Sequence, residues 1–207
     1  MILSHPPELL RRFYPSLMWE VKTKKNNVYL TFDDGPTPGV TNLVLDKLKT
    51  YGAKATFFCL GNNSKKHPDL FNRIIAEGHA IGNHTYNHMN GWKNTTSDFL
   101  ADVRSFEEFH QTKLFRPPYG RITPSQITAL KKEYKIVMWS ILSLDYDRRV
   151  SPQKCQETTF RQLKPGSIIV FHDSEKAKRN MLPTLDKVLE KIYENGWKCK
   201  RIKNKLK

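Results

Sequence analysis

The sequence predicts an α/β fold in which parallel strands alternate with helices. Short runs rich in β-branched and aromatic residues are separated by segments with helical spacing, and strand and helix alternate seven times. Crossover helices of this kind imply parallel strands, arranged either as a barrel or as an open doubly wound sheet. The chain contains no GxGxxG motif and no phosphate-binding loop, so the nucleotide-binding forms of the open sheet have little support and no nucleotide cofactor is expected.

The individual elements follow from residue spacing and local punctuation. Expected strands span residues 28–32, 54–60, 79–83, 113–116, 135–140, 167–172 and 197–202. Expected helices span residues 40–52, 68–78, 95–110, 124–134 and 182–196. Helix starts are indicated by Thr95 with Asp98, which resembles a capping box, and by Pro124, Pro152 and Pro183. Helix ends are indicated by Gly52, Gly78 and Gly196.

Length and composition suit a single domain. The 207 residues, 38% of them hydrophobic, are enough for a sizeable core. We expect this domain to span residues 28–207. Residues 1–27 are expected to form a leader packed on the domain, with a short helical piece and a strand near residues 17–21.

The chain is strongly basic. Its formal charge is +15, from 35 Lys and Arg against 20 Asp and Glu, and six of the last ten residues are basic. Such an excess favours anionic partners such as cell-wall polymer, acidic lipid headgroups or nucleic acid. Solvated helix faces and a frayed tail also account for any single cluster of lysines.

The cysteines and the N-terminus bear on the compartment. Cys59, Cys155 and Cys199 are an odd number without CxxC spacing, so reduced structural thiols are expected. No run reaches the ~18 apolar residues of a membrane span, and residues 1–15 are broken by prolines and arginines where a signal peptide needs an unbroken apolar core. We therefore expect a cytoplasmic monomer without a transmembrane segment, with association with the cell envelope left open by the charge.

Two short motifs combine metal-ligand side chains. In HTYNH, residues 84–88, one helical turn would point His84 and His88 the same way. TFDDGP, residues 31–36, ends a strand with Asp33 and Asp34, which is ordinary turn punctuation unless both carboxylates reach one pocket. Two imidazoles and one carboxylate would leave coordination positions open for water and substrate, as hydrolytic zinc sites require.

Further polar residues follow the other strands. Arg116 in FRPPYG could pair with a carboxylate, and that proline-rich loop could hold a backbone N–H for an oxyanion. Asp145 lies in SLDYD, and His172 lies in VFHD, where a lone histidine is usually a satisfied core residue. The ends of parallel strands in a barrel share one rim, so the positions of these residues predict a common site.

In chain order, TFDDGP, HTYNH, RPPYG, WSILSLDY and IIVFHD resemble the five motifs of the polysaccharide deacetylases, the NodB homology domain of carbohydrate esterase family four. The resemblance covers about residues 28–202 and makes 28–207 the catalytic domain. It implies a distorted seven-stranded, TIM-like (β/α) barrel with its catalytic rim at the C-terminal strand ends. It also implies one divalent metal ion, usually zinc, with cobalt or another divalent ion as alternatives, and removal of acetyl groups from sugars, most often N-acetylglucosamine units.

The resemblance also implies a role for each motif residue. Asp34, His84 and His88 match the metal ligands, and Asp33 matches the general base, which Arg116 would hold. His172 matches the general acid, oriented by Asp145, and Tyr119 matches the residue whose backbone N–H joins the oxyanion hole.

Two motifs depart from the family pattern at positions expected near the substrate. Leu142 and Tyr146 stand where DxxDW is common, and Val170 stands where Leu is usual. Trp92, Tyr119 and Tyr146 could stack on sugar faces or pack against the barrel. These changes concern the acetyl pocket and the bound sugar, while Asp145 and His172 are present.

Other functions fit parts of the pattern. An O-acetyl esterase acting on xylan needs the same groups as an N-deacetylase. Iron oxygenases share two histidines and a carboxylate, although the strand and helix alternation argues against their all-β scaffold. A noncatalytic binder of anionic polymer or nucleic acid would use the charge, but binding alone gives no reason for the paired carboxylates and histidines. A degenerate deacetylase would bind sugar without turnover. The leading prediction is an enzyme that acts on an acetylated amino-sugar oligomer or polymer. The positive charge of the chain is compatible with an anionic substrate.

Overall fold

The structure of the protein, a computed structural model, describes residues 4–206. The strands are β1 (Asn27–Asp33), β2 (Thr56–Cys59), β3 (Ala80–Asn83), β4 (Leu114–Phe115), β5 (Lys135–Ile136), β6 (Ile141–Leu142), β7 (Ile168–His172) and β8 (Lys198–Cys199). The α-helices are α1 (Glu8–Phe13), α2 (Thr41–Thr50), α3 (Gly61–Lys66), α4 (Pro68–Ala76), α5 (Thr96–Glu107), α6 (Pro124–Leu130), α7 (Pro152–Phe160) and α8 (Lys178–Glu194). A 3₁₀ turn, η1, spans Pro118–Gly120.

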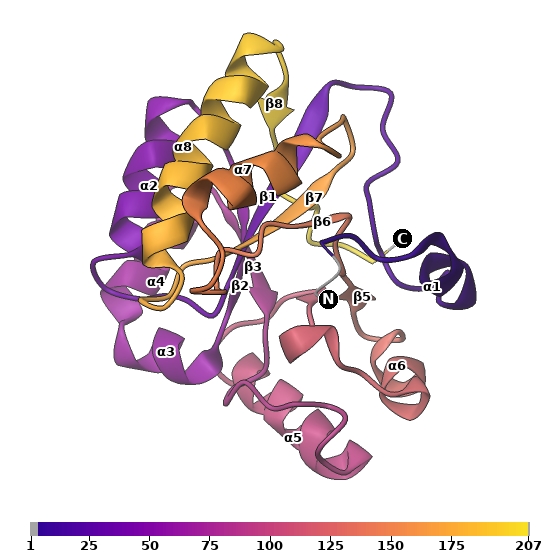
Figure 1. Ribbon diagram of the computed structural model, residues 1–207. Helices are drawn as coiled ribbons and strands as arrows, with labels where there is room; N and C mark the ends of the chain where they lie inside the picture. The colour runs from indigo at the N-terminus through magenta and orange to yellow at the C-terminus, as the bar shows by residue number, and fades with distance from the viewer. Residues whose placement is uncertain (1–3, 207) are drawn as a thin grey trace.

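Seven parallel strands form a curled barrel in the order β5-β4-β3-β2-β1-β7-β6, and helices cover its outside (Figure 1). The predicted distorted seven-stranded barrel is confirmed. Helices α2, α4 and α8 pack against one flank, and α5 and α6 pack against another. The two end strands of the path, β5 and β6, leave the barrel open between them. None of the helices within residues 4–206 is both long enough and apolar enough to cross a membrane.

The identity of the seventh strand differs from the prediction. Only residues 135–136 of the strand expected at 135–140 form a strand, β5, and β6 at residues 141–142 was not expected. The chain between β5 and β6 crosses from the β4 side to the β7 side. The carbonyls of Val137 and Met138 accept hydrogen bonds from Arg116 instead of continuing the sheet. The strand expected at residues 197–202 is only β8, which pairs with the first residues of β1 and lies off the barrel path.

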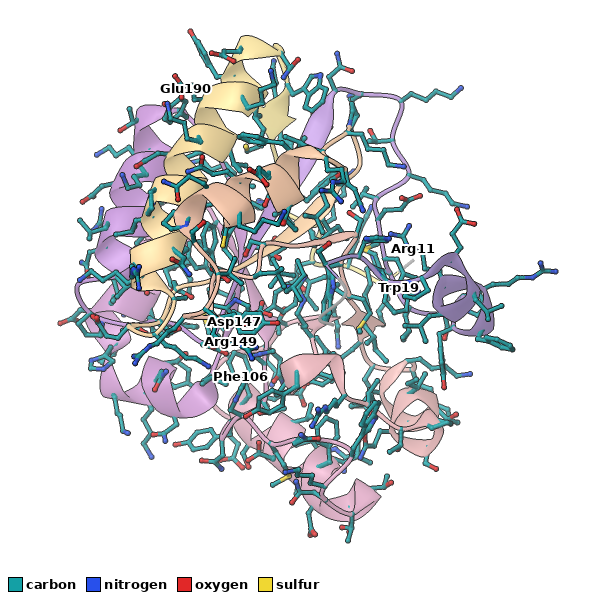
Figure 2. The ribbon with its side chains drawn as sticks, viewed as in Figure 1. Arg11, Trp19, Phe106, Asp147, Arg149 and Glu190 are labelled. Carbon is teal, nitrogen blue, oxygen red and sulfur yellow. The ribbon has the colours of Figure 1, made fainter. Side chains whose placement is uncertain are left out.

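Residues 4–27 cover the opening of the barrel. Met18 forms a bridge with Val137 on the β5 side, and the Leu142 N–H of β6 donates to the Ser4 carbonyl at 2.7 Å. Trp19 is buried beside α1 and donates its ring N–H to the Tyr14 carbonyl (Figure 2). The expected short helix is α1, whereas the expected strand at 17–21 is only the bridge at Met18. The domain boundary at residue 27 stays a prediction.

Helix boundaries follow the predicted punctuation except in α8. The Thr95 side chain caps α5, Pro124 and Pro152 begin α6 and α7, and Gly52, Gly78 and Gly196 follow helices with positive φ. Helix α3 was not expected, and α7 was indicated only by Pro152 at its start. Helix α8 begins at Lys178, so Pro183 lies inside the helix and not at its start. Asn180 and Met181 extend its buried face toward the N-terminus, and this packing outweighs the preference of proline for the first turn.

Strand alternation directs the chemistry-bearing residues into the barrel. In β1, Val28, Leu30 and Phe32 point outward into the core beneath α2 and α8. Tyr29 lies on the opposite face, with Phe58 and Ile168 in the interior cluster. The same period of two places Asp33 at the inner face where β1 ends, and Asp33 is the register partner of His172 in β7.

Candidate active site

A cavity of about 500 Å³ lies at the C-terminal ends of the strands. Eight of the eleven predicted site residues line it: Asp33, Asp34, His84, His88, Tyr119, Tyr146, Val170 and His172. Arg116 and Asp145 contact residues of that group from behind, and Trp92 lies outside the cavity. Asp145 follows β6, a strand that was not expected, and not the fifth strand.

The two adjacent aspartates reach one cavity because the backbone turns between them. Asp33 ends β1, and Asp34 has a φ of 80°, a left-handed conformation that reverses the alternation expected of a continuing strand. The Asp34 carbonyl accepts a hydrogen bond from Asn63 at 2.8 Å. The next residue must be glycine, since a Cβ on Gly35 would lie 2.0 Å from the Asp173 carboxylate.

The histidine pair does not lie on a helix, so the predicted helical turn is wrong. Thr85 and His88 have φ of 68° and 60°, and the segment folds as an irregular loop. The loop is held by side chains, because Asn83 Oδ1 accepts the Thr85 N–H at 2.7 Å and Asp102 Oδ2 accepts the Asn87 N–H at 3.0 Å. These bonds replace the helical ladder and still turn both imidazoles toward Asp34.

Asp34, His84 and His88 form one group of candidate metal ligands. Asp34 Oδ1 lies 3.7 Å from His84 Nε2 and 3.2 Å from His88 Nε2. The candidate ligand atoms all lie within 4.8 Å of one another. Among residues 4–206 the buried Asp34 Oδ1 also finds no hydrogen-bond partner, which is costly unless a cation satisfies it.

The protonation states of His84 and Asp34 also suit a cation. Burial lowers the pKa of His84 to about 4, so its imidazole is neutral near pH 7. Its Nδ1 lies 2.8 Å from the Arg116 carbonyl, a contact that places the ring proton on Nδ1 and turns the Nε2 lone pair toward Asp34. Burial opposes ionisation of Asp34, but the imidazoles of His88, His172 and His84 hold its pKa well below the usual range. Neutral imidazoles with an ionised carboxylate are the donor set that zinc and similar divalent ions prefer.

Arg116 fixes the second carboxylate, Asp33. The guanidinium is fully buried and its Nη1 donates to Asp33 Oδ1 at 2.7 Å and to Thr31 Oγ1 at 2.8 Å. Its Nε and Nη2 donate to the carbonyls of Val137 and Met138 at 3.1 and 2.9 Å. The arginine therefore ties β1 to the segment that links β5 and β6, and Asp33 cannot turn away from the cavity.

A glycine in β3 makes room for this arginine. The guanidinium of Arg116 lies over the Phe58 ring, 4.1 Å from its centroid. A Cβ on Gly82 would come within 2.4 Å of the Phe58 ring. A larger residue at position 82 would displace the ring on which Arg116 rests.

His172 and Asp145 form the opposite wall. His172 Nδ1 lies 2.7 Å from Asp145 Oδ1, and the His172 backbone N–H donates to Asp145 Oδ2 at 2.7 Å. Burial alone would lower the pKa of His172, but the charge and hydrogen bond of Asp145, with Asp34 and Asp33 nearby, raise it to about 9. The imidazole is therefore protonated near pH 7, with Nε2 as the nitrogen that does not face Asp145.

The remaining predicted residues differ in their access to the cavity. Tyr119 has a φ of 60° within η1, and its ring centroid lies 4.5 Å from that of His88. Tyr146 packs edge-on against His172, with ring centroids 5.0 Å apart. Val170 lines the wall as the register partner of Leu142. Trp92 is 65% exposed, and its ring N–H donates to a backbone carbonyl outside the cavity.

Comparisons with known proteins agree with this geometry. The sequence model that describes polysaccharide deacetylases matches residues 20–137 of this chain. The chain belongs to the polysaccharide deacetylase family. Two proteins of Bacillus cereus, both called peptidoglycan-N-acetylglucosamine deacetylase, are 37% and 33% identical to this family member. The first match covers 83% of this chain and 65% of that protein, and the second covers 87% and 88%.

A solved structure has the same fold as this polysaccharide deacetylase family member. The crystal structure of the Bc1960 peptidoglycan N-acetylglucosamine deacetylase, in complex with an N-oxidanyl-benzamide, matches with a TM-score of 0.86. The two chains are 33% identical, and the match covers 95% of each.

The sequence did not predict the roles of two buried carboxylates of this family member, Asp102 and Asp173. Asp102 on α5 accepts hydrogen bonds from the loop that carries His88, and Asp173 accepts the Gly35 N–H at 3.1 Å behind Asp34. Burial raises the pKa of Asp173 to about 7. A signal existed for Asp102, since it lies among the apolar positions of its helix, where a carboxylate needs a buried partner. Asp173 directly follows His172, but its neighbours in the chain give no sign of its contacts.

Proposed function

We propose that this protein is a metal-dependent hydrolase that removes acetyl groups from N-acetylated sugars of a glycan such as peptidoglycan or chitooligosaccharide. One observation carries the proposal. A buried carboxylate held by arginine, Asp33, and an imidazolium held by a carboxylate, His172, are register partners at the ends of adjacent strands, and they share one cavity with the Asp34, His84 and His88 group. This arrangement supplies a base and an acid beside a cation-binding group.

The residues fit a divalent cation. Asp34, His84 and His88 would hold it, and the unpartnered Asp34 Oδ1 supports this assignment. When bound, such an ion polarises the acetyl carbonyl and activates a water molecule for attack. We favour zinc because two neutral imidazoles and one carboxylate are a common ligand set of hydrolytic zinc sites.

Asp33 is assigned as the general base. Arg116 engages its Oδ1, so the other oxygen is the one that accepts the proton of the attacking water. The same arginine fixes the carboxylate by a 2.7 Å contact, which keeps the proton acceptor at the floor of the cavity.

His172 is assigned as the general acid. Burial would lower the pKa of His172, but Asp145 raises it to about 9. The ring therefore keeps its proton at neutral pH. With Nδ1 occupied by Asp145, Nε2 donates that proton to the departing amine of the sugar. The pKa lies above 7, so the proton is present when the amide bond breaks.

The substrate carbonyl and methyl group need their own contacts. We assign the backbone N–H of Tyr119 to the developing oxyanion, because η1 lines the cavity beside His88. Val170 and Leu142 are register partners and line the same wall, so they offer an apolar surface for the acetyl methyl group.

Acetate release tests the proposal. We would incubate the protein with peptidoglycan fragments, chitooligosaccharides and acetylated xylan, each with and without a chelator. Release from one of the N-acetylated glycans that stops with chelator and returns with zinc or cobalt is expected. Release from acetylated xylan alone would instead identify an O-acetyl esterase. Binding of glycan without acetate release from any of them would contradict the proposed activity.

A further inference from the structure

A large basic cavity lies at the end of the barrel opposite the candidate active site. It has a volume of about 1140 Å³, and its wall includes the loop 22–25, Lys54 and the segment 198–203. We call it the basic groove. The loop precedes β1, Lys54 precedes β2, and β8 pairs with the first residues of β1 (Figure 1). Since β1 has seven residues, the groove lies roughly 20 Å from the catalytic rim.

The groove is lined by many basic residues. The loop contributes three lysines, and the segment 198–203 contributes three lysines and one arginine. No Asp or Glu among residues 4–206 lines the groove. Within the described residues, neither these segments nor Lys54 form a salt bridge, and Lys54 and Arg201 donate to the backbone carbonyls of Glu77 and Gly78. Such a concentration of one sign of charge in a concave surface attracts anions.

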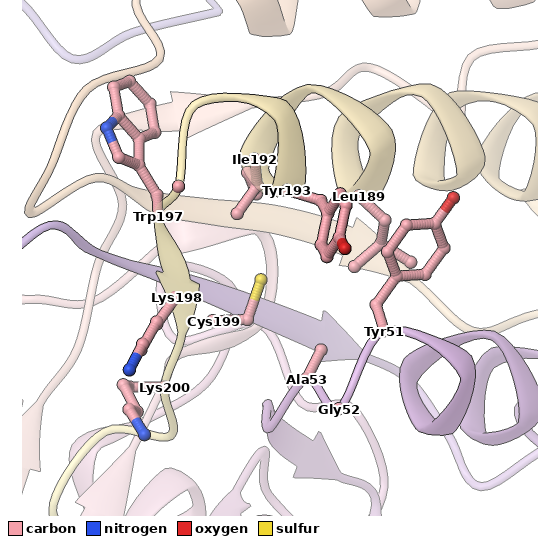
Figure 3. A pocket seen from close by; sticks show the side chains of 11 residues that line it. Tyr51, Gly52, Ala53, Leu189, Ile192, Tyr193, Trp197, Lys198, Cys199 and Lys200 are labelled. Carbon is pink, nitrogen blue, oxygen red and sulfur yellow. The ribbon is translucent and has the colours of Figure 1, made fainter.

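An aromatic cavity continues from the basic groove. It has a volume of about 470 Å³, and Tyr51, Tyr193 and Trp197 lie around it (Figure 3). Tyr193 is 73% exposed and Tyr51 is 38% exposed, and the centroids of their rings lie 6.1 Å apart. Lys198 and Lys200 line both cavities, so the two form one continuous surface across β8.

We propose that this continuous surface is a noncatalytic binding site for an anionic glycan. Exposed aromatic rings stack on sugar rings, and the lysines pair with carboxylate or phosphate groups along the polymer. A polynucleotide has related chemistry, and the choice of a glycan rests on the proposed function, which already gives this chain a glycan substrate. The surface is concave, which suits a linear chain better than the flat face of a bilayer.

The position of the surface gives it a role that the active site does not supply. A glycan bound at the N-terminal ends of the strands does not occupy the cavity at their C-terminal ends. The two sites therefore bind at the same time, and a polymer held at the far surface keeps further acetylated units near the catalytic rim. The gain comes from effective concentration and is specific to long anionic polymers.

Binding of unacetylated probes tests this inference separately from catalysis. Oligogalacturonate offers carboxylates and a glycerol-phosphate teichoic acid offers phosphates, and neither presents an N-acetyl sugar for the catalytic cavity. Titration calorimetry at low and high ionic strength would compare wild type with Lys24→Gln/Lys200→Gln/Lys203→Gln. Removal of three contacts is expected to weaken binding of at least one probe about tenfold at low ionic strength. The matched variant, Lys65→Gln/Lys66→Gln/Lys154→Gln, removes the same charge elsewhere and is expected to bind within about twofold of wild type.

The aromatic part has its own readout. Tyr193→Ala is expected to weaken binding of oligogalacturonate about fivefold at both ionic strengths, since stacking on its sugar rings does not depend on salt. Acetate release from a short neutral chitooligosaccharide is expected to be unchanged in all three variants.

Equal binding by the two triple variants would overturn the inference. Tighter binding of oligothymidylate, or of phosphatidylglycerol vesicles, than of both glycans would also overturn it. Probe binding by a protein that releases no acetate from any glycan would overturn the proposed activity and leave this surface in place.

Discussion

His84 and His172 face the same cavity, but one imidazole is neutral and the other carries a proton. His84 is buried and His172 is partly buried, and burial lowers the pKa of His84 to about 4. The pKa of His172, which burial would also lower, is instead raised to about 9. The difference lies in the group that each Nδ1 faces: His84 faces the Arg116 carbonyl, and His172 faces the Asp145 carboxylate.

The comparison shows how one cavity separates two kinds of chemistry. A neutral imidazole bound to a carbonyl is a ligand, because its Nε2 lone pair stays free. An imidazolium bound to a carboxylate is a proton donor, because its second N–H points away from the pair. The protonation state of each histidine is set by one neighbour that follows another strand. A single substitution can therefore abolish the metal ligand or shift the pKa of the proton donor.

The largest effect is expected on the ligand side. His84→Ala removes one of the three candidate ligands, so we expect both loss of bound metal and acetate release at background level. Metal content by mass spectrometry and acetate release measured on one sample check this. His5→Ala, an exposed histidine that does not line the cavity, should keep both. A full equivalent of metal in His84→Ala would remove His84 from the ligand set.

Substitution of the base should separate catalysis from metal binding. Asp33→Asn keeps the shape of the side chain and removes its ability to accept a proton. We expect kcat/KM to fall by about 10² to 10⁴, or roughly 3 to 5 kcal/mol of transition-state stabilisation, with metal retained. Asp69→Asn, on the exposed start of α4, is the matched control. A native rate in metal-loaded Asp33→Asn would refute the assignment of the base.

The proton-donor side should respond mainly to pH. The raised pKa of His172 means that its imidazolium is populated below about pH 9 and lost above it. In Asp145→Asn, burial lowers the pKa of His172 and the carboxylate no longer opposes it, so the alkaline limb of the rate profile moves to lower pH. If the pKa of His172 falls to the ordinary value of a histidine, the rate at about pH 8 should fall about 30-fold, and the rate at lower pH should fall less.

A pH profile of kcat on one N-acetylated glycan checks the shift. Asp147 lies two residues away and pairs with Arg149 at the surface, 2.7 Å apart (Figure 2). Asp147→Asn should therefore leave the alkaline limb in place. If Asp145→Asn and wild type share one profile, the imidazolium of His172 is not the proton donor.

The sequence predicted the strand ends better than it predicted the loops. Asp33 and His172 reach the cavity because period-two alternation places them on the inner face, a rule that applies to any strand. Asp34 and His88 reach it through positive φ, which non-glycine sequence does not reveal, and the expected helical turn at 84–88 was wrong for this reason. One strand was expected at 135–140, but β5 ends at residue 136 and β6 begins only at residue 141. The carbonyls of Val137 and Met138 between them accept hydrogen bonds from Arg116, contacts that are not local in the chain.

The smallest effect is expected from a residue that touches no ligand ring. Asp102 Oδ2 accepts the N–H groups of Tyr86 and Asn87, and its Oδ1 accepts the Asn87 side-chain amide at 2.7 Å. These bonds hold the loop in the conformation that turns His88 toward Asp34, so the ligand side of the cavity needs a support on α5. Asp102→Asn turns one acceptor into a donor that faces the Asn87 amide, and the loop loses part of that support.

We expect Asp102→Asn to weaken zinc affinity about tenfold, the lower range for residues that orient metal ligands, and to leave the pH profile of kcat unchanged at saturating zinc. Competition with a chromophoric chelator measures the affinity, and Asp98→Asn on the exposed side of the same helix is the control. A shifted alkaline limb at saturating zinc would show that the loop also influences His172. Ligand and acid would then be coupled through the cavity, and the separation between the two histidines would fail.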